Sequence, residues 1–303
     1  MRIGIFAGEA LDASGDINAL IAGAQAAADD GFDSFWIPNI FSGDALVALG
    51  VVAHAVPGIK LGTAVVPTYP RHPGALAQQA ATVNAISGGR LTLGIGLSHQ
   101  IVIENMFGYS FDKPLRHMRE YLSILRPLVH GEAVSFQGEV LSANIAVSVG
   151  GGRPMPILVA ALGPQMLALA GEMAEGTITW MTGPETIAGH TVPTLRASAE
   201  KHGRPEPRVC VGVPICVTDD VAAGRERAAG VFQVYGFLPS YKAMLDREGF
   251  AGPADMAVVG NEAEVRARLA AFAEAGATDL VAAEFGGTPA EQARTRELLR
   301  SLL

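Results

Sequence analysis

The sequence predicts a (β/α)8 TIM barrel with insertions, because short apolar segments alternate with helical segments along its 303 residues. Eight segments have the pattern of buried strands, and helical segments separate nearly all of them. The chain has 36 glycines and only 6% aromatic residues, as suits short buried strands joined by tight turns. A doubly wound sheet is the structural alternative. It usually has fewer strands and a glycine fingerprint after the first, where this chain has only Gly4 and Gly8.

The clearest unit of this repeat is the segment 61–98, LGTAVVPTYPRHPGALAQQAATVNAISGGRLTLGIGLS. It contains an apolar strand (LGTAVV), a proline-rich loop, a helix and a second strand at residues 90–95. The helix places four apolar residues on one face: Leu76, Ala80, Val83 and Ile86. Ser87-Gly88-Gly89 ends the helix, because glycine readily takes the left-handed conformation of a helix C-terminus. The segment is therefore one βαβ unit.

The other units follow the same pattern. Further strands are predicted at residues 2–6, 34–37, 156–160, 177–180, 208–217 and 279–283. Further helices are predicted at residues 16–29, 44–56, 113–130, 164–173, 185–202 and 219–231. Two more helices begin with capping boxes, one from Asn261 to Glu264 and one from Thr288 to Glu291.

Three segments interrupt the repeat, and we expect residues 1–303 to form one barrel domain with insertions near 99–112, 131–152 and 233–255. The first is too long for a simple turn. The second has the pattern of a short β excursion, and the third is mostly helical with several aromatics. The first and third are expected to shape a substrate pocket.

The composition excludes several classes of protein. A net charge of −8 makes non-specific binding to nucleic acid or an anionic membrane a poor expectation. No charged leader and no apolar run of membrane-spanning length occurs in the sequence. Cys210 and Cys216 lie on one face of one predicted strand, where they cannot pair, and no metal-ligand pattern surrounds them. A reduced, cytoplasmic protein without a bound metal is expected.

In a barrel, loops that follow the strands carry the ligand site. The small-residue turn at residues 161–165 feeds directly into a helix, whose N-terminal N–H groups suit a phosphate, although an ordinary strand-to-helix turn has the same pattern. Gly94 and Gly96 leave room for a flat ligand or simply ease packing. Trp36 and Trp180 are expected to fill the core.

His99 is the best acid–base candidate, because it follows a strand at the ligand end and imidazole titrates near neutrality. A solvated loop histidine is the competing interpretation. Arg71 and His72 precede a helix, where a structural role is the more common one. The remaining histidines lie within or at the ends of helices and are assigned no chemistry: His54, His117, His130, His190 and His202.

The segment 61–98 resembles the signature region of the bacterial-luciferase-like superfamily, in particular its branch of oxidoreductases that use the deazaflavin coenzyme F420. SGGR-x-x-LGIG-x-S and the A-A-L-G-P turn are specific in combination. The likeness extends to segments that begin at Phe107, Pro154 and Thr278, and so covers nearly the whole chain.

This resemblance implies a homodimer and a cofactor ring held against a non-prolyl cis peptide, here at Ala64–Val65. The phosphate-bearing tail would meet the backbone of the turn made by Ala161, Leu162, Gly163, Pro164 and Gln165. Asn39, Ser98 and His99 match positions that commonly touch the ring or the substrate.

The sugar-phosphate dehydrogenases of this branch carry an acidic residue and a histidine in the loop after the second strand, where this chain has residues 38–41 (PNIF). They also carry a glutamate near the position of His99. We therefore expect hydride transfer between F420 and a small, fairly apolar organic molecule, with reduction of an activated C=C or C=N bond favoured. His99 is the first candidate for the proton donor and Tyr69 the second. Two alternatives stay open: an FMN-dependent monooxygenase of the same superfamily, and a non-catalytic flavin-binding barrel.

Overall fold

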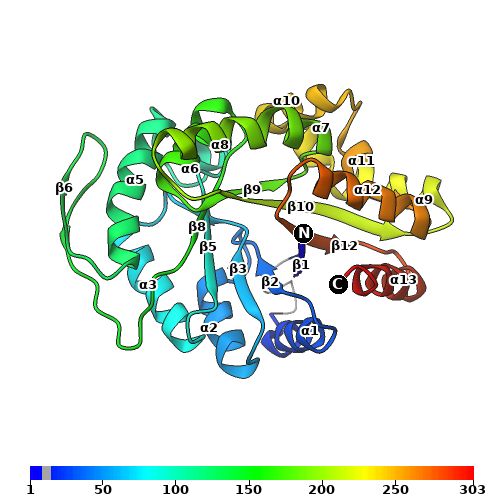
Figure 1. Cartoon of the computed structure of the whole chain (residues 1–303), viewed down its shortest axis with the longest axis horizontal. Helices are drawn as coiled ribbons and strands as arrows, with labels where there is room; N and C mark the ends of the chain where they lie inside the picture. Colours follow the sequence, from blue (N-terminus) through cyan, green and yellow to red (C-terminus); the bar gives the residue numbers. More distant parts are fainter. Residues whose placement is uncertain (9–14) are drawn as a thin grey trace.

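A closed ring of parallel strands forms the centre of the molecule in this computed structural model, which describes residues 1–8 and 15–303 (Figure 1). The barrel strands are β1 (Arg2–Phe6), β2 (Ser34–Ile37), β3 (Lys60–Thr63), β5 (Leu91–Gly96), β8 (Ile157–Ala160), β9 (Gly176–Trp180), β10 (Arg208–Val217) and β12 (Asp279–Glu284). Each pairs with the next in this order, and β12 returns to β1. The predicted eight-stranded barrel is confirmed, because a doubly wound sheet would stay open at two edges.

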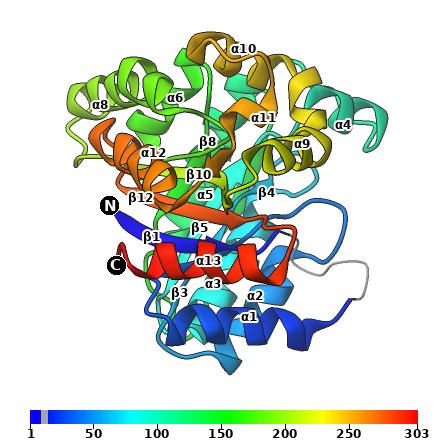
Figure 2. The same cartoon turned by 90° about the vertical axis from the view of Figure 1, so that its right-hand side faces the viewer.

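Helices surround this barrel on the outside (Figures 1 and 2). The longer ones are α1 (Ile17–Asp29), α2 (Ala45–Ala55), α3 (Pro73–Ile86), α5 (Pro114–Val129), α6 (Pro164–Met173), α8 (Val192–Lys201), α9 (Val221–Val231), α12 (Glu262–Glu274) and α13 (Pro289–Arg300). Short helices connect some of these units: α4 (Gln100–Asn105), α7 (Pro184–Thr186), α10 (Pro239–Glu248), α11 (Pro253–Met256), a π-helical turn (Ile187–Thr191) and a 3₁₀ turn (Gln233–Phe237). Among the described residues, no helix has the length and apolar character needed to span a membrane.

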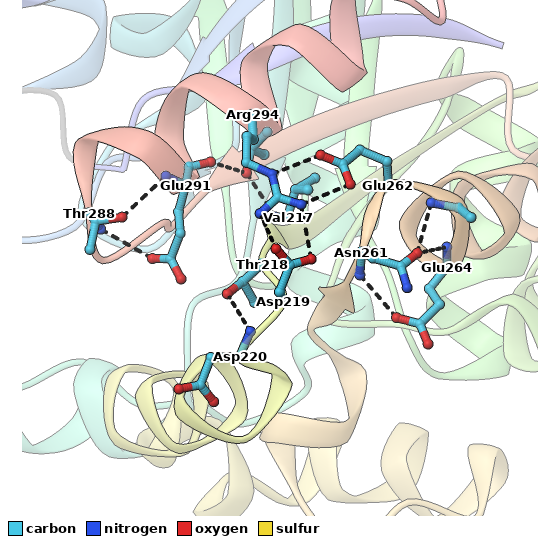
Figure 3. Close-up of polar contacts among 12 residues, drawn as sticks. Val217, Thr218, Asp219, Asp220, Asn261, Glu262, Glu264, Thr288, Glu291 and Arg294 are labelled. Carbon is cyan, nitrogen blue, oxygen red and sulfur yellow. Dashed lines mark hydrogen bonds and ion pairs between the residues drawn. The ribbon is translucent and has the colours of Figure 1, made fainter.

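Both predicted capping boxes are present (Figure 3). The Asn261 side chain accepts from the backbone N–H of Glu264, whose carboxylate accepts from the backbone of Asn261. Thr288 and Glu291 make the same pair of bonds at α13. Each box satisfies backbone donors that the first helical turn leaves unpaired. Arg294 then joins the two helices, since it binds a carboxylate oxygen of Glu262 at 2.8 Å.

The barrel interior is filled by apolar side chains that the strands point inward, among them Trp36 and Cys210. Trp36 is 1% exposed, and its Nε1 donates to Ser34 Oγ at 2.8 Å. The prediction that Trp36 fills the core is therefore confirmed. Both cysteines are buried free thiols, so the expectation that they do not pair also holds.

The predicted strand at residues 61–66 is broken in the structure. β3 ends at Thr63, and the chain resumes as β4 (Val66–Pro67), which also pairs with β5. The break is accompanied by two bonds between strands: Thr63 Oγ1 donates to the carbonyl of Gly94 at 2.8 Å and accepts from its N–H at 2.9 Å. A Cβ on Gly94 would lie 2.0 Å from the Thr63 carbonyl oxygen, so only glycine permits this approach.

Three smaller differences from the sequence predictions concern isolated elements. The segment 99–112 is not all loop, since it contains α4. The sequence did not predict the short strand β11 (Val258–Gly260), which pairs with the carboxyl end of β10. Ile86 is 48% exposed, whereas its spacing on α3 predicted a buried position.

The other two insertions have the predicted character. Residues 131–152 contain the antiparallel hairpin of β6 (Val134–Gln137) and β7 (Ser142–Ile145), which projects from the barrel beside α5 and α3 (Figure 1). Residues 233–255 are mostly helical. The 3₁₀ turn and the first residues of α10 lie over the carboxyl ends of the strands, where they line the cavity described below.

Candidate functional site

A cavity of about 1650 Å³ opens at the carboxyl ends of the barrel strands. This volume exceeds the ~300–1,000 Å³ of an ordinary ligand pocket, so it has room for two ligands side by side. The turns after β1, β2, β5, β8 and β12 line one part of it, and the insertion at 233–255 lines another. The predicted residues that line the cavity are Asn39, Ala64, Val65, Ser98, His99, Ala161, Leu162 and Gly163. Eight of the eleven residues predicted for the site therefore line one cavity.

One wall is made by the break between β3 and β4. The peptide bond between Ala64 and Val65 is cis, at the position where the resemblance placed it. Both side chains line the cavity, and Val65 packs close to Gly96, on which a Cβ would lie 2.8 Å from Val65 Cγ2. These small residues give the cavity a close-packed wall that a flat ring could lie against.

Asn39 is fixed by a group of polar contacts beside this wall. Its Oδ1 accepts from the backbone N–H of Ala45 at 3.0 Å and from Arg71 Nη2 at 3.3 Å. Arg71 also forms an ion pair with Asp44, which caps α2. Because Oδ1 already has two partners, the amide nitrogen of Asn39 is the atom left to donate to a ligand.

Ser98 and His99 form the junction between β5 and α4. Ser98 has a φ of 62°, an uncommon conformation for a residue other than glycine, and such residues cluster at functional sites. His99 precedes α4, and its ring centroid lies 5.9 Å from that of Tyr241 on α10. Burial lowers the pKa of His99 below the ordinary 6.5, so the imidazole is mostly neutral at pH 7.

Tyr69 does not line the cavity, in contrast to His99. Its ring is stacked between His117, with centroids 3.9 Å apart, and Phe111, with centroids 5.2 Å apart. The hydroxyl is buried without a hydrogen-bond partner among the described residues. Burial, with smaller effects of Asp112 and Glu104, raises the pKa of Tyr69 to about 12. It is therefore protonated but lies behind the wall, which weakens its case as the proton donor.

The turn at residues 161–165 supplies another wall and leads into α6. Ala161, Leu162 and Gly163 line the cavity, whereas Pro164 and Gln165 do not. Gly163 is the N-cap residue of α6, so no capping side chain competes for the N–H groups of the first turn. His190, on the π-helical turn, lies 2.8 Å through Nε2 from the Leu162 carbonyl oxygen. Since a carbonyl only accepts, Nε2 carries the proton, and the helical His190 supports the turn from behind.

His72 has a structural role in the described residues. Its Nδ1 accepts from the N–H of Gly74 at 3.1 Å and thereby caps α3. Its Nε2 donates to the carbonyl of Ser142 on the β6–β7 hairpin at 3.1 Å. Arg71, the preceding residue, does line the cavity.

Several aromatic residues of the cavity were missed by the sequence interpretation. Trp180 was expected in the core, but it lines the cavity. Its position at the end of β9 could have signalled this, because the last inward residue of a barrel strand faces the mouth. Phe6 and Phe232 were missed in the same way. Tyr235 and Tyr241 belong to the insertion at 233–255, which was expected to shape the pocket, and Phe285 follows a strand end that was expected at the mouth.

Few charges lie in the cavity wall. Among the residues that the structure describes, those with charged side chains are Arg71, Glu104 and Glu284. Burial raises the pKa of Glu284, and its partner Arg296 opposes this effect. No three His, Cys, Asp or Glu side chains within residues 1–8 and 15–303 gather closely enough to hold a metal ion. This wall suits an organic ligand bound by shape, stacking and a few hydrogen bonds.

Comparison with known proteins gives a consistent result. A family model described as luciferase-like monooxygenase matches residues 1–279. The 5,10-methylenetetrahydromethanopterin reductase of Methanolobus tindarius is 32% identical over 281 residues, which cover 91% of this chain and 85% of that protein.

Two solved structures share the fold across their length. The coenzyme F420-dependent tetrahydromethanopterin reductase of Methanopyrus kandleri superposes with a TM-score of 0.81 at 22% identity, over 99% of this chain and 97% of that one. The oxygenating constituent of 3,6-diketocamphane monooxygenase from Pseudomonas putida, in complex with FMN, has a TM-score of 0.78 at 18% identity, over 99% and 96%. At these identities the likeness concerns the fold alone.

Proposed function

The chain belongs to the luciferase-like monooxygenase family, and on this premise we propose that it is an oxidoreductase that transfers a hydride between coenzyme F420 and a small organic substrate. The observation that carries the proposal is the close-packed cavity wall of Ala64, Val65 and Gly96, in a chain 32% identical to a 5,10-methylenetetrahydromethanopterin reductase. Reduction of an activated C=C or C=N bond is the direction we favour.

The residues of the cavity fit a deazaflavin. The wall of Ala64, Val65 and Gly96 would lie against one face of the ring, and Asn39 would donate to its edge. A Cβ on Gly163 would have no neighbour within 4 Å, so a phosphate could approach the N–H groups of the first turn of α6 at this point. We propose the Ala161–Gln165 turn as the binding site of the cofactor tail on this basis.

Bound F420 would supply or accept the hydride, and the protein would orient the two reactants and exclude water. His99 is the residue that we propose for the proton, since it lines the cavity and Tyr69 does not. Its lowered pKa means that the protonated imidazole, the better donor, is populated only at acidic pH.

Titration of the apoprotein with F420 and with FMN, in parallel, tests the cofactor assignment. We expect F420 to bind more tightly, and the reduced form to be oxidised when a substrate is added under anaerobic conditions. Preferred binding of FMN together with oxygen consumption would instead support the monooxygenase, since an FMN-bearing structure has the same fold as this chain. Tight binding of F420 without turnover of any acceptor would support the non-catalytic barrel.

The role of His99 is tested by His99→Ala and His99→Gln. If the imidazolium donates the proton, the rate of substrate reduction falls as pH rises through a value below 6.5, and this dependence disappears in both variants. His54→Ala, at an exposed histidine outside the cavity wall, is the matched control and should keep the wild-type profile. An unchanged pH profile in His99→Ala would remove His99 from the mechanism.

Two further expectations stay predictions. The resemblance implies a homodimer, which light scattering of the purified protein would test. The assignment of residues 1–303 to one domain predicts a single cooperative unfolding transition, measured by calorimetry.

A further inference from the structure

We propose that the part of the cavity beside the insertion binds a neutral, planar, apolar substrate. We call this part the aromatic compartment and define it by Trp180, Phe232, Tyr235, Tyr241 and Phe285, all of which line the cavity. The inference rests on the proposed hydride transfer, since it names the class of molecule that would lie beside the cofactor.

The rings of the compartment are close enough to act as one surface. Trp180, Phe232 and Tyr235 form a triangle, with centroids 6.1 Å apart for Trp180 and Phe232, 6.2 Å for Trp180 and Tyr235, and 6.5 Å for Phe232 and Tyr235. Tyr235 packs edge-on against Tyr241 at 4.9 Å, and Phe232 against Phe285 at 5.6 Å. Tilted and edge-on arrangements of this kind present ring faces and edges to a flat ligand, which could stack on them.

This surface is built from segments far apart in the sequence. Trp180 ends β9, Phe285 follows β12, and the other three rings come from the end of α9, the 3₁₀ turn and α10. A small apolar cluster that includes Met181, Met256 and Cys216 supports them from behind. The compartment therefore rests on a packed base and does not depend on a ligand for its shape.

The charges in the cavity wall argue against an anionic substrate. Arg71, the one cation of the wall among the described residues, is paired with Asp44. Glu284 accepts from Arg296 Nε at 2.9 Å, and Glu104 accepts from the amide of Gln100. A carboxylate or phosphate on the substrate would enter this space without a charge partner, which is costly in a poorly solvated site.

The polar atoms of the compartment suit neutral acceptors. Burial raises the pKa of Tyr235 and of Tyr241, so both hydroxyls stay protonated at neutral pH and can donate to a carbonyl or an imine. The Tyr241 ring also lies 5.9 Å from that of His99. A molecule stacked in the compartment would thus have its reacting atoms next to the residue proposed for proton transfer.

Isothermal titration calorimetry with two probes of the same shape tests the inference. Naphthalene-2-methanol is neutral and planar, and 2-naphthoate differs mainly by its charge. We expect the neutral probe to bind the wild-type protein, both alone and saturated with F420, and the naphthoate to bind more than about tenfold more weakly. Equal affinities, or tighter binding of the naphthoate, would overturn the proposal.

Two variants test whether naphthalene-2-methanol binds in the aromatic compartment. Tyr235→Ala removes a half-buried ring of the wall and should weaken naphthalene-2-methanol about tenfold, given the usual contribution of an aromatic contact. Leu238→Ala, in the same insertion, should weaken it less and guards against misfolding of the first variant. Tyr109→Ala, at an exposed tyrosine outside the cavity wall, is the matched control and should leave the affinity unchanged.

The same titrations separate this inference from the proposed function. If Tyr235→Ala and Leu238→Ala bind the neutral probe as the wild type does, the rings merely pack the insertion and the proposal is wrong. If F420 fails to bind the wild type while the probes behave as expected, the cofactor assignment fails and the compartment stands. Circular dichroism of each variant confirms that the fold is retained.

Discussion

The two ends of the barrel differ in polarity: buried charged groups are hydrogen-bonded at the amino end, whereas the carboxyl end has a mostly apolar cavity wall. At the amino ends of the strands, Asp279 is 3% exposed and accepts from Arg2 Nη2 at 2.8 Å and from Arg208 Nη2 at 3.0 Å. Arg90, at the same end, donates to four backbone carbonyls. At the carboxyl ends, the wall is mostly apolar, and Ser98 and Met181 have positive φ angles.

We interpret this difference as a separation of roles, in which the amino end stabilises the fold and the carboxyl end binds ligands. Networks of ion pairs and hydrogen bonds close the amino end, as expected of the face of a barrel that carries no ligand site. The carboxyl end keeps unfilled volume and unusual backbone conformations, which a fold optimised only for stability would not retain. Substitutions at the amino end should therefore affect unfolding, and those around the cavity should affect ligands.

The largest effect on stability is expected from Asp279→Ala. It would leave the charges of Arg2 and Arg208 without their shared buried partner, and we expect a loss of about 3 kcal/mol in the free energy of unfolding. Denaturant titration measures it. Asp246→Asn, which removes an exposed partner of Lys242, should cost less than about 0.5 kcal/mol. Similar losses for the two variants would contradict the role given to the amino end.

The same carboxylate predicts a pH dependence. Burial alone would raise the pKa of Asp279, but hydrogen bonds and charge from Arg208, with Thr278 and Arg2, outweigh it and hold the pKa below 3.8. A lowered pKa contributes stability above the unfolded value of 3.8, which is lost as pH falls through the folded value. The difference in unfolding free energy between wild type and Asp279→Asn should thus shrink below that pH. A difference that stays constant down to the acid transition would refute this account.

A smaller loss is expected from Arg90→Met, which keeps the apolar stem of the side chain. Four carbonyls, those of Ala53, Val56, Ile59 and Ser87, lose a charged donor, and we expect a destabilisation of about 2 kcal/mol. The affinity for F420 should stay unchanged, because the site lies at the other end. Arg116→Met, at an exposed ion pair with Glu139, provides the control and should be near neutral.

The smallest effect, with the opposite sign, is expected at the cavity. Ser98→Gly relieves a left-handed conformation and should stabilise the fold by about 0.5 kcal/mol, while it weakens F420 if the Ser98 hydroxyl contacts the ring. Gly88→Ala, at a φ of 70° after α3, is the reverse exchange and should destabilise by about 1 kcal/mol without a change in affinity. Thermal melts and cofactor titrations of both variants would show whether strain at the mouth serves binding.

The barrel was predictable because its signal is repeated along the chain. Apolar strands alternate with helical segments along the chain, several helices have a capping side chain or a glycine stop, and errors in one unit do not disturb the others. The missed elements carry little local signal: α4 buries only Ile103 and has no capping side chain, and β11 has three residues. The break after Thr63 is accompanied by its bonds to Gly94, a contact between strands that a local pattern does not contain.

The site was predictable where it follows strand ends and unpredictable where it depends on tertiary packing. Ser98 and His99 were located because the last residues of barrel strands meet at one mouth. Tyr69 does not line the cavity because its ring turns toward His117 on α5, a helix with no apparent relation to the site in the sequence. Of the aromatic compartment, the insertion was expected near the pocket, but Trp180 and Phe232 were missed because the meeting of these rings depends on packing between three separate parts of the chain.

The two cysteines of β10 lie in different parts of the molecule, so their reactivity can be used to measure opening in each part. Burial raises the pKa of both thiols, and since the thiolate is the reactive form, alkylation requires the surrounding structure to open. Cys210 lies in the barrel interior toward the amino end, and Cys216 lies beneath the aromatic compartment. The ratio of their alkylation rates therefore reports whether the mouth can open while the base of the barrel stays closed.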